Sequence, residues 1–407
     1  MGKISKIALI MLLLLSIAAG AALVMASRAD IGASTVASEI AGAVRQYMGA
    51  DLSITSIYGN PLRGFVISDL SITRNNSKVF SSMQATVTFR LLSLITGSPR
   101  IKTLSLGGAD LDWGEISPLV SFEQTGEPLS LPFDRFEIQK SIVRTAAGDF
   151  RIEEARIVPG GSDITMTGSL FFRGTPFSVR GSLLLEKERL LLNDLNIRVA
   201  GGNISLSGRL TPVTDVAGKI SNLDLAILEK LWPDLARQGY SGTFSTTFAA
   251  KGLLPDVDIE GKLEIPEGKV YGIELDKVTS PWNFSDNALQ ITDLQGRANG
   301  TPVSGKLLFA FSSMPPVTTI DLRAGKTDIS AWRKSFPWLS IAGGVIDSAE
   351  IRLQGLSNAL SGPVTLRSSS LTLAKQPLSD VRASMNLEKG SRTVSYTHLT
   401  LPTKRIV

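Results

Sequence analysis

The chain has 407 residues, with 42 Lys and Arg, 37 Asp and Glu, one His and no Cys. The lack of Cys excludes disulfides, zinc–thiolate sites and thiol catalysis, and the small, scattered positive excess gives little support to nucleic-acid binding. The length suffices for about two or three ordinary domains or one extended repeat array. Gly and Pro are plentiful and aromatic residues few, as expected of many strands and turns.

Residues 7–26 form a run of 20 residues without a charge or a proline. A helix of this length spans about 30 Å, the hydrocarbon thickness of a bilayer. Lys3 and Lys6 precede the run, so the positive-inside tendency places the N-terminus in the cytoplasm. We therefore predict a transmembrane anchor within residues 1–28, and a signal peptide cleaved near Ala26 is the alternative. Both interpretations export the rest of the chain.

Residues 30–48 have the pattern of an amphipathic helix, because Val36, Ile40 and Val44 recur at helical spacing. We interpret it as a lid on one end of a β structure, and a lever at the membrane surface is the alternative. Strand patterns then follow at 52–57, 65–72, 79–80, 85–89, 101–106 and 109–113. The helix and these strands form a predicted unit at 29–115.

A proline-containing segment without a clear period, around residues 118–132, is predicted to be a linker or a crossover. From Phe133 onward, strands are nearly continuous and no long helix separates them, which predicts an antiparallel meander. Residues 257–265 show the plan most clearly, with Val, Ile, Gly, Leu and Ile alternating with charged residues. We expect a turn at 266–269.

Two segments of similar layout, 223–235 and 327–339, interrupt the strands. Each has apolar residues at helical spacing, and Asp224 aligns with Asp328 at an offset of 104. Val278 aligns with Val381 at an offset of 103. We predict an array of repeats, each built of strands and one short helix, within residues 116–394.

No catalytic constellation is present in the sequence. The single His, His398, lies in a tail that does not continue the strand pattern, and the acidic residues alternate onto polar strand faces or fall in turns. The Gly-Gly pairs do not form a phosphate-binding motif, and no metal-ligand spacing appears. We predict no enzyme activity, no metal and no cofactor.

Residues 395–407 are interpreted as a non-native tail of the kind that arises when adapter sequence is translated. On this interpretation the chain is truncated near Arg392. The alternative is a genuine short polar terminus.

The remaining feature is the apolar face of the predicted strands. Each large apolar side chain is worth roughly 1.5–3 kcal/mol when it leaves water, so this face needs a cover. One candidate is a second sheet, as in a β-sandwich, and the other is a lipid held in a strongly curved groove. The candidate lining residues are Ile164, Met166, Leu170, Leu183, Leu185, Leu195, Ile197, Ile204, Leu206, Phe244, Phe248, Ile259, Leu263, Ile265, Leu307, Phe309, Ile351, Leu353, Val364 and Leu366.

Three features together resemble the AsmA/TamB superfamily of diderm bacteria, and the TamB-like branch most of all. They are the exported anchor, the Gly-Asn-Pro-Leu-Arg-Gly-Phe-Val-Ile-Ser-Asp-Leu segment at 59–70, and the Ile-Ser-Asn-Leu-Asp-Leu segment at 220–225. The strand series with Gly-x-Leu-x-Ile steps also fits, so the resemblance covers roughly residues 3–389.

The resemblance implies an inner-membrane, single-pass protein with most of its chain in the periplasm. It also implies a mainly β fold, an extended taco-like groove with a few short helices, that carries phospholipid towards the outer membrane. TamB-like members end in a domain that meets an outer-membrane β-barrel, and no such domain is evident here. The alternatives are an assembly factor for outer-membrane proteins that works with a β-barrel partner, and a structural envelope tether.

Overall fold

The computed structural model describes residues 41, 45 and 50–387, except 61, 75, 92, 94–99, 117–132, 147, 187–188, 232–238, 254–255 and 314. The predicted anchor at 7–26, nearly all of the predicted helix at 30–48 and the predicted tail at 395–407 lie outside these residues. Ala41 and Arg45 are helical, and the guanidinium of Arg45 lies 2.6 Å from the carboxylate of Asp51.

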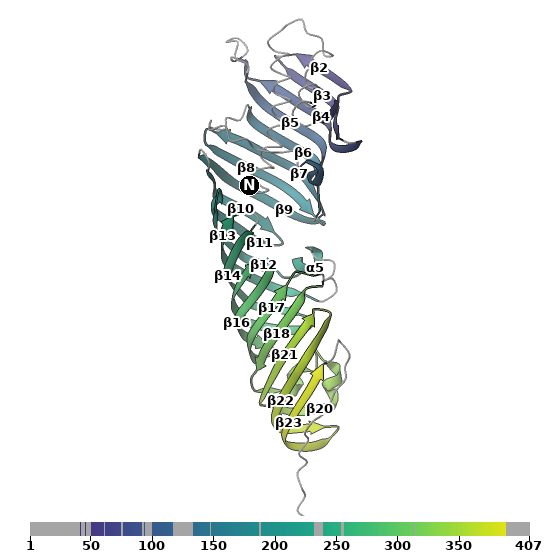
Figure 1. Cartoon of the computed structure of the whole chain (residues 1–407), viewed down its shortest axis with the longest axis vertical. Coiled ribbons are helices and arrows are strands. Elements are labelled where there is room, and N and C mark those ends of the chain that lie inside the picture. Colours follow the sequence, from purple (N-terminus) through teal and green to yellow (C-terminus); the bar gives the residue numbers. More distant parts are fainter. Residues whose placement is uncertain are drawn as a thin grey trace, which may run out of the picture. The chain divides into compact units, whose positions relative to one another are not determined.

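The described part of the chain is mainly β, with many strands in an open, largely antiparallel sheet and a few short helices (Figure 1). The chain divides into two compact units. The first comprises 1–200, 204–216 and 253–255, and the second comprises 201–203, 217–252 and 256–407.

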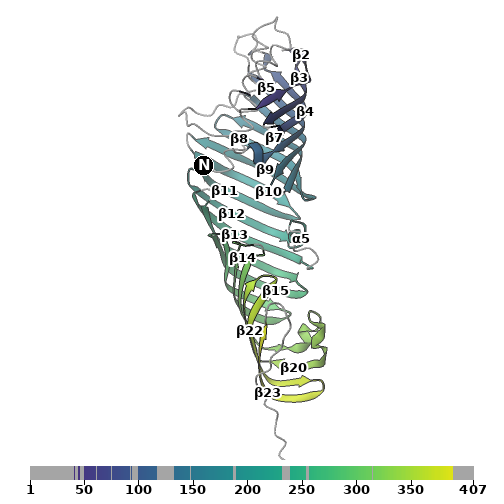
Figure 2. The same ribbon diagram turned by 45° about the vertical axis from the view of Figure 1, so that its right-hand side comes forward.

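The first unit contains strands that follow one another in the sheet in chain order, with β1 and β2 both paired to β3 (Figure 2). Its elements are β1 (Asp51–Ser53), β2 (Ser56–Asn60), β3 (Gly64–Arg74), β4 (Ser77–Phe89), β5 (Ile101–Asp112), α4 (Trp113–Ile116), β6 (Phe133–Thr145), β7 (Gly148–Gly160), β8 (Asp163–Phe172), β9 (Thr175–Glu186), β10 (Arg189–Val199) and most of β11 (Gly202–Thr211).

One pair in the first unit is parallel: Ile101 lies opposite Phe133, and Leu104 opposite Phe136. Parallel neighbours need a crossover connection. The pairing of β5 with β6 is consistent with the crossover alternative, and the segment predicted as a linker or crossover lies outside the described residues. The meander predicted after Phe133 is confirmed from β6 to β10, where each pair of neighbouring strands is antiparallel.

Strands β4 and β5 are each continuous, although the sequence predicted two strands in each. A polar stretch interrupts the apolar pattern of β4, but buried Ser82 donates its hydroxyl to the carbonyls of Gln84 and Gly107 at 3.0 and 3.1 Å. In β5, Gly108 adopts a φ of 60° and faces Met83, where an added Cβ would lie 2.8 Å from the Met83 sulfur. These local adjustments let both strands run on.

The second unit contains a run of antiparallel neighbours, β14 to β18 and then β21 to β23, with β19 and β20 attached at the side of β22. Its elements are β12 (Thr214–Asp224), α5 (Ile227–Leu231), β13 (Ser241–Leu253), β14 (Asp256–Val270), β15 (Ile273–Ser285), β16 (Ala288–Ala298), β17 (Thr301–Ala310), β18 (Val317–Ala324), β19 (Thr327–Asp328), η3 (Ile329–Trp332), η4 (Pro337–Ile341), β20 (Ala342–Ile346), β21 (Ser348–Leu356), β22 (Ala359–Leu373) and β23 (Gln376–Leu387).

The predicted turn at 266–269 is wrong, because β14 continues to Val270 and the chain turns at Tyr271 and Gly272. Pro266 lacks an N–H and is tolerated in a strand only where the ladder bond is not needed. It lies opposite Lys277, which has a φ of 50°. The ladder bends at that point, so Pro266 does not end the strand.

The two segments predicted to be helical are shorter than expected. In the first, 223–224 belongs to β12 and the described helix is only α5. In the second, 327–328 pairs as β19, and the rest is two 3₁₀ turns, η3 and η4. Both segments begin with an Asp side chain that accepts a backbone N–H two residues later. The Asp224 side chain accepts the N–H of Ala226 at 2.9 Å, and the Asp328 side chain accepts the N–H of Ser330 at 2.8 Å.

Two parts of the second unit correspond in length and local geometry at the offset on which the predicted repeat rests. Strands β14 and β22 both have 15 residues and start 103 positions apart. Gly252 and Gly355, also 103 apart, share a φ of 140°, a conformation that favours glycine. A Cβ there would lie 2.5 Å from the carbonyl oxygen of Asp256 and 2.7 Å from that of Ala359 respectively, two residues that are again 103 apart.

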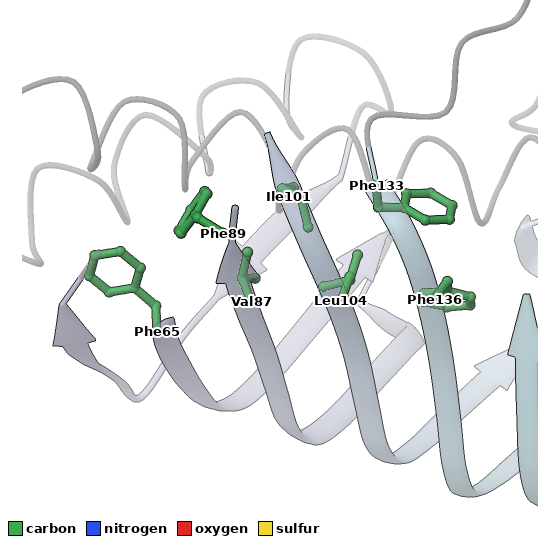
Figure 3. Packing of buried hydrophobic residues seen from close by; sticks show 7 residues of the cluster. All are labelled: Phe65, Val87, Phe89, Ile101, Leu104, Phe133 and Phe136. Carbon is green, nitrogen blue, oxygen red and sulfur yellow. The ribbon is translucent and has the colours of Figure 1, made fainter. Parts of the chain in front are cut away.

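The best-buried cluster lies in the first unit, on neighbouring bent strands β3 to β6 (Figure 3). Phe136 and Leu104 are each 1% exposed, and the rings of Phe65 and Phe89 meet edge to face at 6.2 Å. The seven members are Phe65, Val87, Phe89, Ile101, Leu104, Phe133 and Phe136. A smaller cluster of the second unit joins Leu225, Ile265 and Val278, with Leu228 of α5 packed against it.

Candidate functional site

The candidate site is the apolar face of the sheet, which the strand registers define. Directly opposed residues of an antiparallel pair share one face, so a chain of opposed pairs traces a line across the strands. In the second unit one such line has only apolar members: Trp282, Ile291, Leu307, Ile320 and Leu353. A neighbouring line contains Leu322, Ile351, Val364 and Met385.

The opposite face of the same strands is polar. Glu260 lies opposite Asn283, which lies opposite Gln290. Further along, Lys306 lies opposite Asp321 and then Arg352, whose guanidinium lies 3.9 Å from the Asp321 carboxylate. The second unit therefore has one continuous apolar face and one charged face, and the face with the charged residues can remain in water.

The registers place the predicted lining residues of the second unit from β14 onward on the apolar face. Ile259 lies opposite Phe284, and Leu307 lies opposite Ile320. Phe244, Leu263 and Ile265 belong to or pack against the Leu225 cluster. Phe248 lies 6.3 Å from the Trp282 ring. The others on this face are Phe309, Ile351, Leu353, Val364 and Leu366.

In the first unit, a line runs from Val87 through Leu104, Phe136 and Ile157 to Met166. Predicted residues of β8 to β10 continue this face. Ile164 lies opposite Leu183, and Ile197 opposite Val179. Leu170 lies in β8 and Leu195 in β10. Leu185 lies opposite Leu190, and Ile204 and Leu206 lie in β11.

Burial distinguishes the two ends of the first unit. The members of the line in β4 to β6 are almost fully buried, with Val87, Leu104 and Phe136 each 1% exposed. The predicted residues of β8 to β11 whose side chains are described, such as Met166 and Ile197, are only half-buried. The predicted lining residues from β8 onward are thus less buried than the core of β4 to β6, while Leu190, Leu192 and Val199 of β10 on the same face are buried at 8%, 7% and 4% exposure.

The same partial exposure holds in the second unit. Among its predicted lining residues, Ile265 is buried at 8% exposure and all the others are half-buried. Ile265 lies at the strand ends next to α5, and its partner Val278 is 4% exposed. The short helix covers that edge of the apolar face, while the middle of the strands is less covered.

Aromatic rings lie over glycines in the second unit. A Cβ on Gly218 would come within 2.2 Å of the Phe248 ring, and one on Gly261 within 2.7 Å of the Trp282 ring. The Trp282 indole N–H donates to the hydroxyl of buried Thr246 at 2.9 Å, which fixes the ring. The two rings therefore lie over backbone that glycine leaves bare.

The edge next to the helices carries two ionisable groups with shifted pKa values, Tyr240 and Asp328. Burial, and then the hydrogen bond with Tyr271, raises the pKa of Tyr240, and the two rings meet edge to face at 5.8 Å. The hydrogen bonds from Ser330 lower the pKa of Asp328, as expected of a carboxylate that caps a turn. Both pKa shifts arise from contacts with neighbouring residues.

Several residues of the apolar face were not predicted from the sequence: Trp282, Phe284, Leu289, Ile291, Ile320 and Leu322. In β15 and β16 the register shifts between Asp276 and Trp282 and between Ile291 and Leu294, so the simple alternation is broken. A search for two alternating runs joined by an irregular residue would have found them.

Neither metal-binding groups nor matches to known proteins identify a further site among the described residues. Among the described residues, no group of three or more His, Cys, Asp or Glu side chains is placed to hold a metal ion. Within the same residues, no helix is both long and apolar enough to cross a bilayer. The chain matches no protein-family model, and neither the curated proteins nor the solved structures contain a significant match to it.

Proposed function

We propose that the apolar face lines an open, curved, repeat-built groove that holds the acyl chains of phospholipids. In this proposal, the chain is anchored in the inner membrane of a diderm bacterium through residues 7–26, and the groove crosses part of the periplasm and carries phospholipid towards the outer membrane. The proposal involves no catalytic step and no cofactor. The proposed outer-membrane β-barrel partner rests on the family resemblance alone.

The observation that carries the proposal is the continuous apolar face whose side chains remain half-buried. A β-sandwich core would bury such side chains almost fully, because the two inner faces interdigitate. Here that degree of burial is reached in β3 to β6, around Phe136, but not at Ile259, Leu307 or Leu353. A large apolar surface left partly open needs an occupant, and an acyl chain supplies apolar contact without requiring polar partners.

The charged outer face fits the same proposal. Residues such as Glu260, Lys306 and Arg352 alternate with the apolar residues along each strand. This face is suited to the aqueous periplasm. A structural tether requires only a packed core, so it does not account for an apolar face that stays partly open.

The proposal predicts that lipid accompanies the purified protein. Residues 28–389, which omit the predicted anchor, are to be exported to the periplasm of a Gram-negative host and purified without detergent. Native mass spectrometry is expected to find phospholipid bound in stoichiometric amounts, because water is a poor solvent for both the groove and the acyl chains. A compact, folded and lipid-free particle would contradict the proposal.

A further inference from the structure

The segment Trp332–Ile341 is fixed across the ends of several strands of the second unit. The Trp332 indole N–H donates to the Thr301 hydroxyl at 2.9 Å. The Ser335 hydroxyl donates to the carbonyl of Gly272 at 2.7 Å and accepts from the side-chain amide of Asn299 at 2.9 Å. These bonds hold the segment at the edge of the apolar face, where the β14–β15 and β16–β17 turns lie.

This edge combines apolar and cationic side chains. Trp332 and Phe336 stack at 6.1 Å and are half-buried, whereas Ile341 is 63% exposed. Arg333 and Lys334 are exposed between the two aromatic residues. We call the segment Trp332–Ile341 together with Lys375 the cationic edge.

Lys375 joins the cationic edge through the backbone. It belongs to the turn between β22 and β23, and the N–H of the preceding residue, Ala374, donates to the carbonyl of Ile341 at 2.9 Å. Arg333 donates to the carbonyl of Ala342 at 2.7 Å, so its guanidinium is held near the same place. Two acidic residues lie in this region. The carboxylate of Asp328 already accepts the N–H of Ser330, and exposed Glu274 donates its backbone N–H to the Asn299 side chain that also contacts Ser335.

The segment around Arg333 differs in charge from the corresponding earlier segment at one position, whereas Lys334 aligns with Lys230, which is also exposed. At an offset of 104, the position of Arg333 is occupied in the preceding repeat by Glu229, whose carboxylate accepts the N–H groups of Gly239 and Tyr240 at 2.7 and 3.0 Å. At the other ends of the strands, the second unit carries the acidic residues Asp256 and Asp286. Lys251 lies beside Asp256 at that other edge, so the cationic edge is distinguished by the close grouping of Arg333, Lys334 and Lys375 and not by the charge of a whole edge.

We infer that the cationic edge binds the phosphate headgroup of an anionic phospholipid whose acyl chains lie on the adjoining apolar face. This inference rests on the proposed function. The charges are complementary, and cations beside half-buried aromatic rings and an exposed aliphatic side chain are typical of surfaces that meet the lipid–water interface. The ten residues of β17 extend roughly 33 Å from this edge, while one leaflet of acyl chain is about 15 Å thick, so the face is long enough.

The test compares lipid preference between two variants of the full chain that carry the same charge change. The first replaces Arg333, Lys334 and Lys375 with Gln. The control replaces Lys251, Lys262 and Lys306, which are also exposed, with Gln. Each protein, solubilised in dodecyl maltoside, is equilibrated with equal amounts of dioleoyl phosphatidylglycerol and dioleoyl phosphatidylcholine, and the bound lipids are counted by mass spectrometry. The predicted anchor is common to all the proteins, so its lipids cancel in the comparison.

Wild type and control are expected to prefer phosphatidylglycerol. The triple variant is expected to lose about threefold or more of that preference, with the total amount of bound lipid unchanged. The expected loss is modest because exposed charge contacts are individually weak. The preference should also fall when salt is raised from about 0.05 to 0.5 M. An equal loss in test and control variants, or no loss in either, overturns the inference and leaves the groove intact. If none of the proteins binds lipid through the groove, the proposed groove is overturned as well. The Lys334→Gln, Lys375→Gln double variant keeps the Arg333 bond to Ala342 and serves if the triple variant misfolds.

Discussion

Replacing both Ile259 and Leu263 with Asp is expected to remove most of the phospholipid bound by the second unit while the sheet stays folded. Both residues are half-buried on the apolar face, and two carboxylates beside acyl chains would lose their hydration without gaining partners. A penalty of only 1.4 kcal/mol is a factor of ten, so bound lipid should fall by about tenfold or more. The measurement is native mass spectrometry of the purified variant, with circular dichroism as the check on folding.

The matched control places the same charges on the other face. Ser304 and Gln354 are exposed on the polar face, opposite Arg323 and Thr319 respectively, and are replaced with Asp. This variant should keep its lipid. If the Ile259 and Leu263 variant simply unfolds while the control stays folded, those two side chains belong to a closed core and the groove interpretation fails at that position.

Replacing Phe136 with Ala is expected to destabilise the first unit by about 3–5 kcal/mol, the usual cost of removing a buried Phe side chain. Phe136 is 1% exposed and lies in the line between Leu104 and Ile157. Amide hydrogen exchange in β5 to β7 should therefore speed up by about a hundredfold or more.

The half-buried residue Ile197 provides the comparison. It lies on the same face in β10, and its replacement with Ala should cost only about 1 kcal/mol, because less surface is removed from contact. Equal effects of the two substitutions would show that the apolar face is as closed at β10 as at β6, which is the behaviour of a continuous core and not of a groove.

Much of the β architecture could be predicted because charged and apolar residues alternate directly along the strands. In β14 the alternation from Val257 to Ile265 sets the face of every residue, and the structure follows it. The similar beginnings of the two helical segments could also be predicted, because Asp224 and Asp328 make the same short-range bond to the backbone. Such local chemistry is visible in the sequence itself.

Other features depend on contacts between distant residues. The parallel pairing of Ile101 with Phe133 joins two strands whose connecting sequence has no clear period, so alternation along the chain does not predict it. The irregular register near Lys277 moves Trp282 and Phe284 onto the apolar face, and single-strand alternation does not show such a shift. The degree of burial could not be predicted from the sequence either, because Phe136 and Met166 lie on one line of opposed residues but differ in exposure.

The most direct test of the groove is to ask which face of a single strand touches lipid. Leu307 and Lys306 are neighbours in β17, with Leu307 on the apolar face and Lys306 on the polar face. A photo-crosslinking amino acid is placed at one position or the other in the full chain, cells are irradiated, and phospholipid adducts are counted by mass spectrometry. The groove predicts adducts at 307 and almost none at 306. Equal labelling at the two positions, or none at 307, would contradict it.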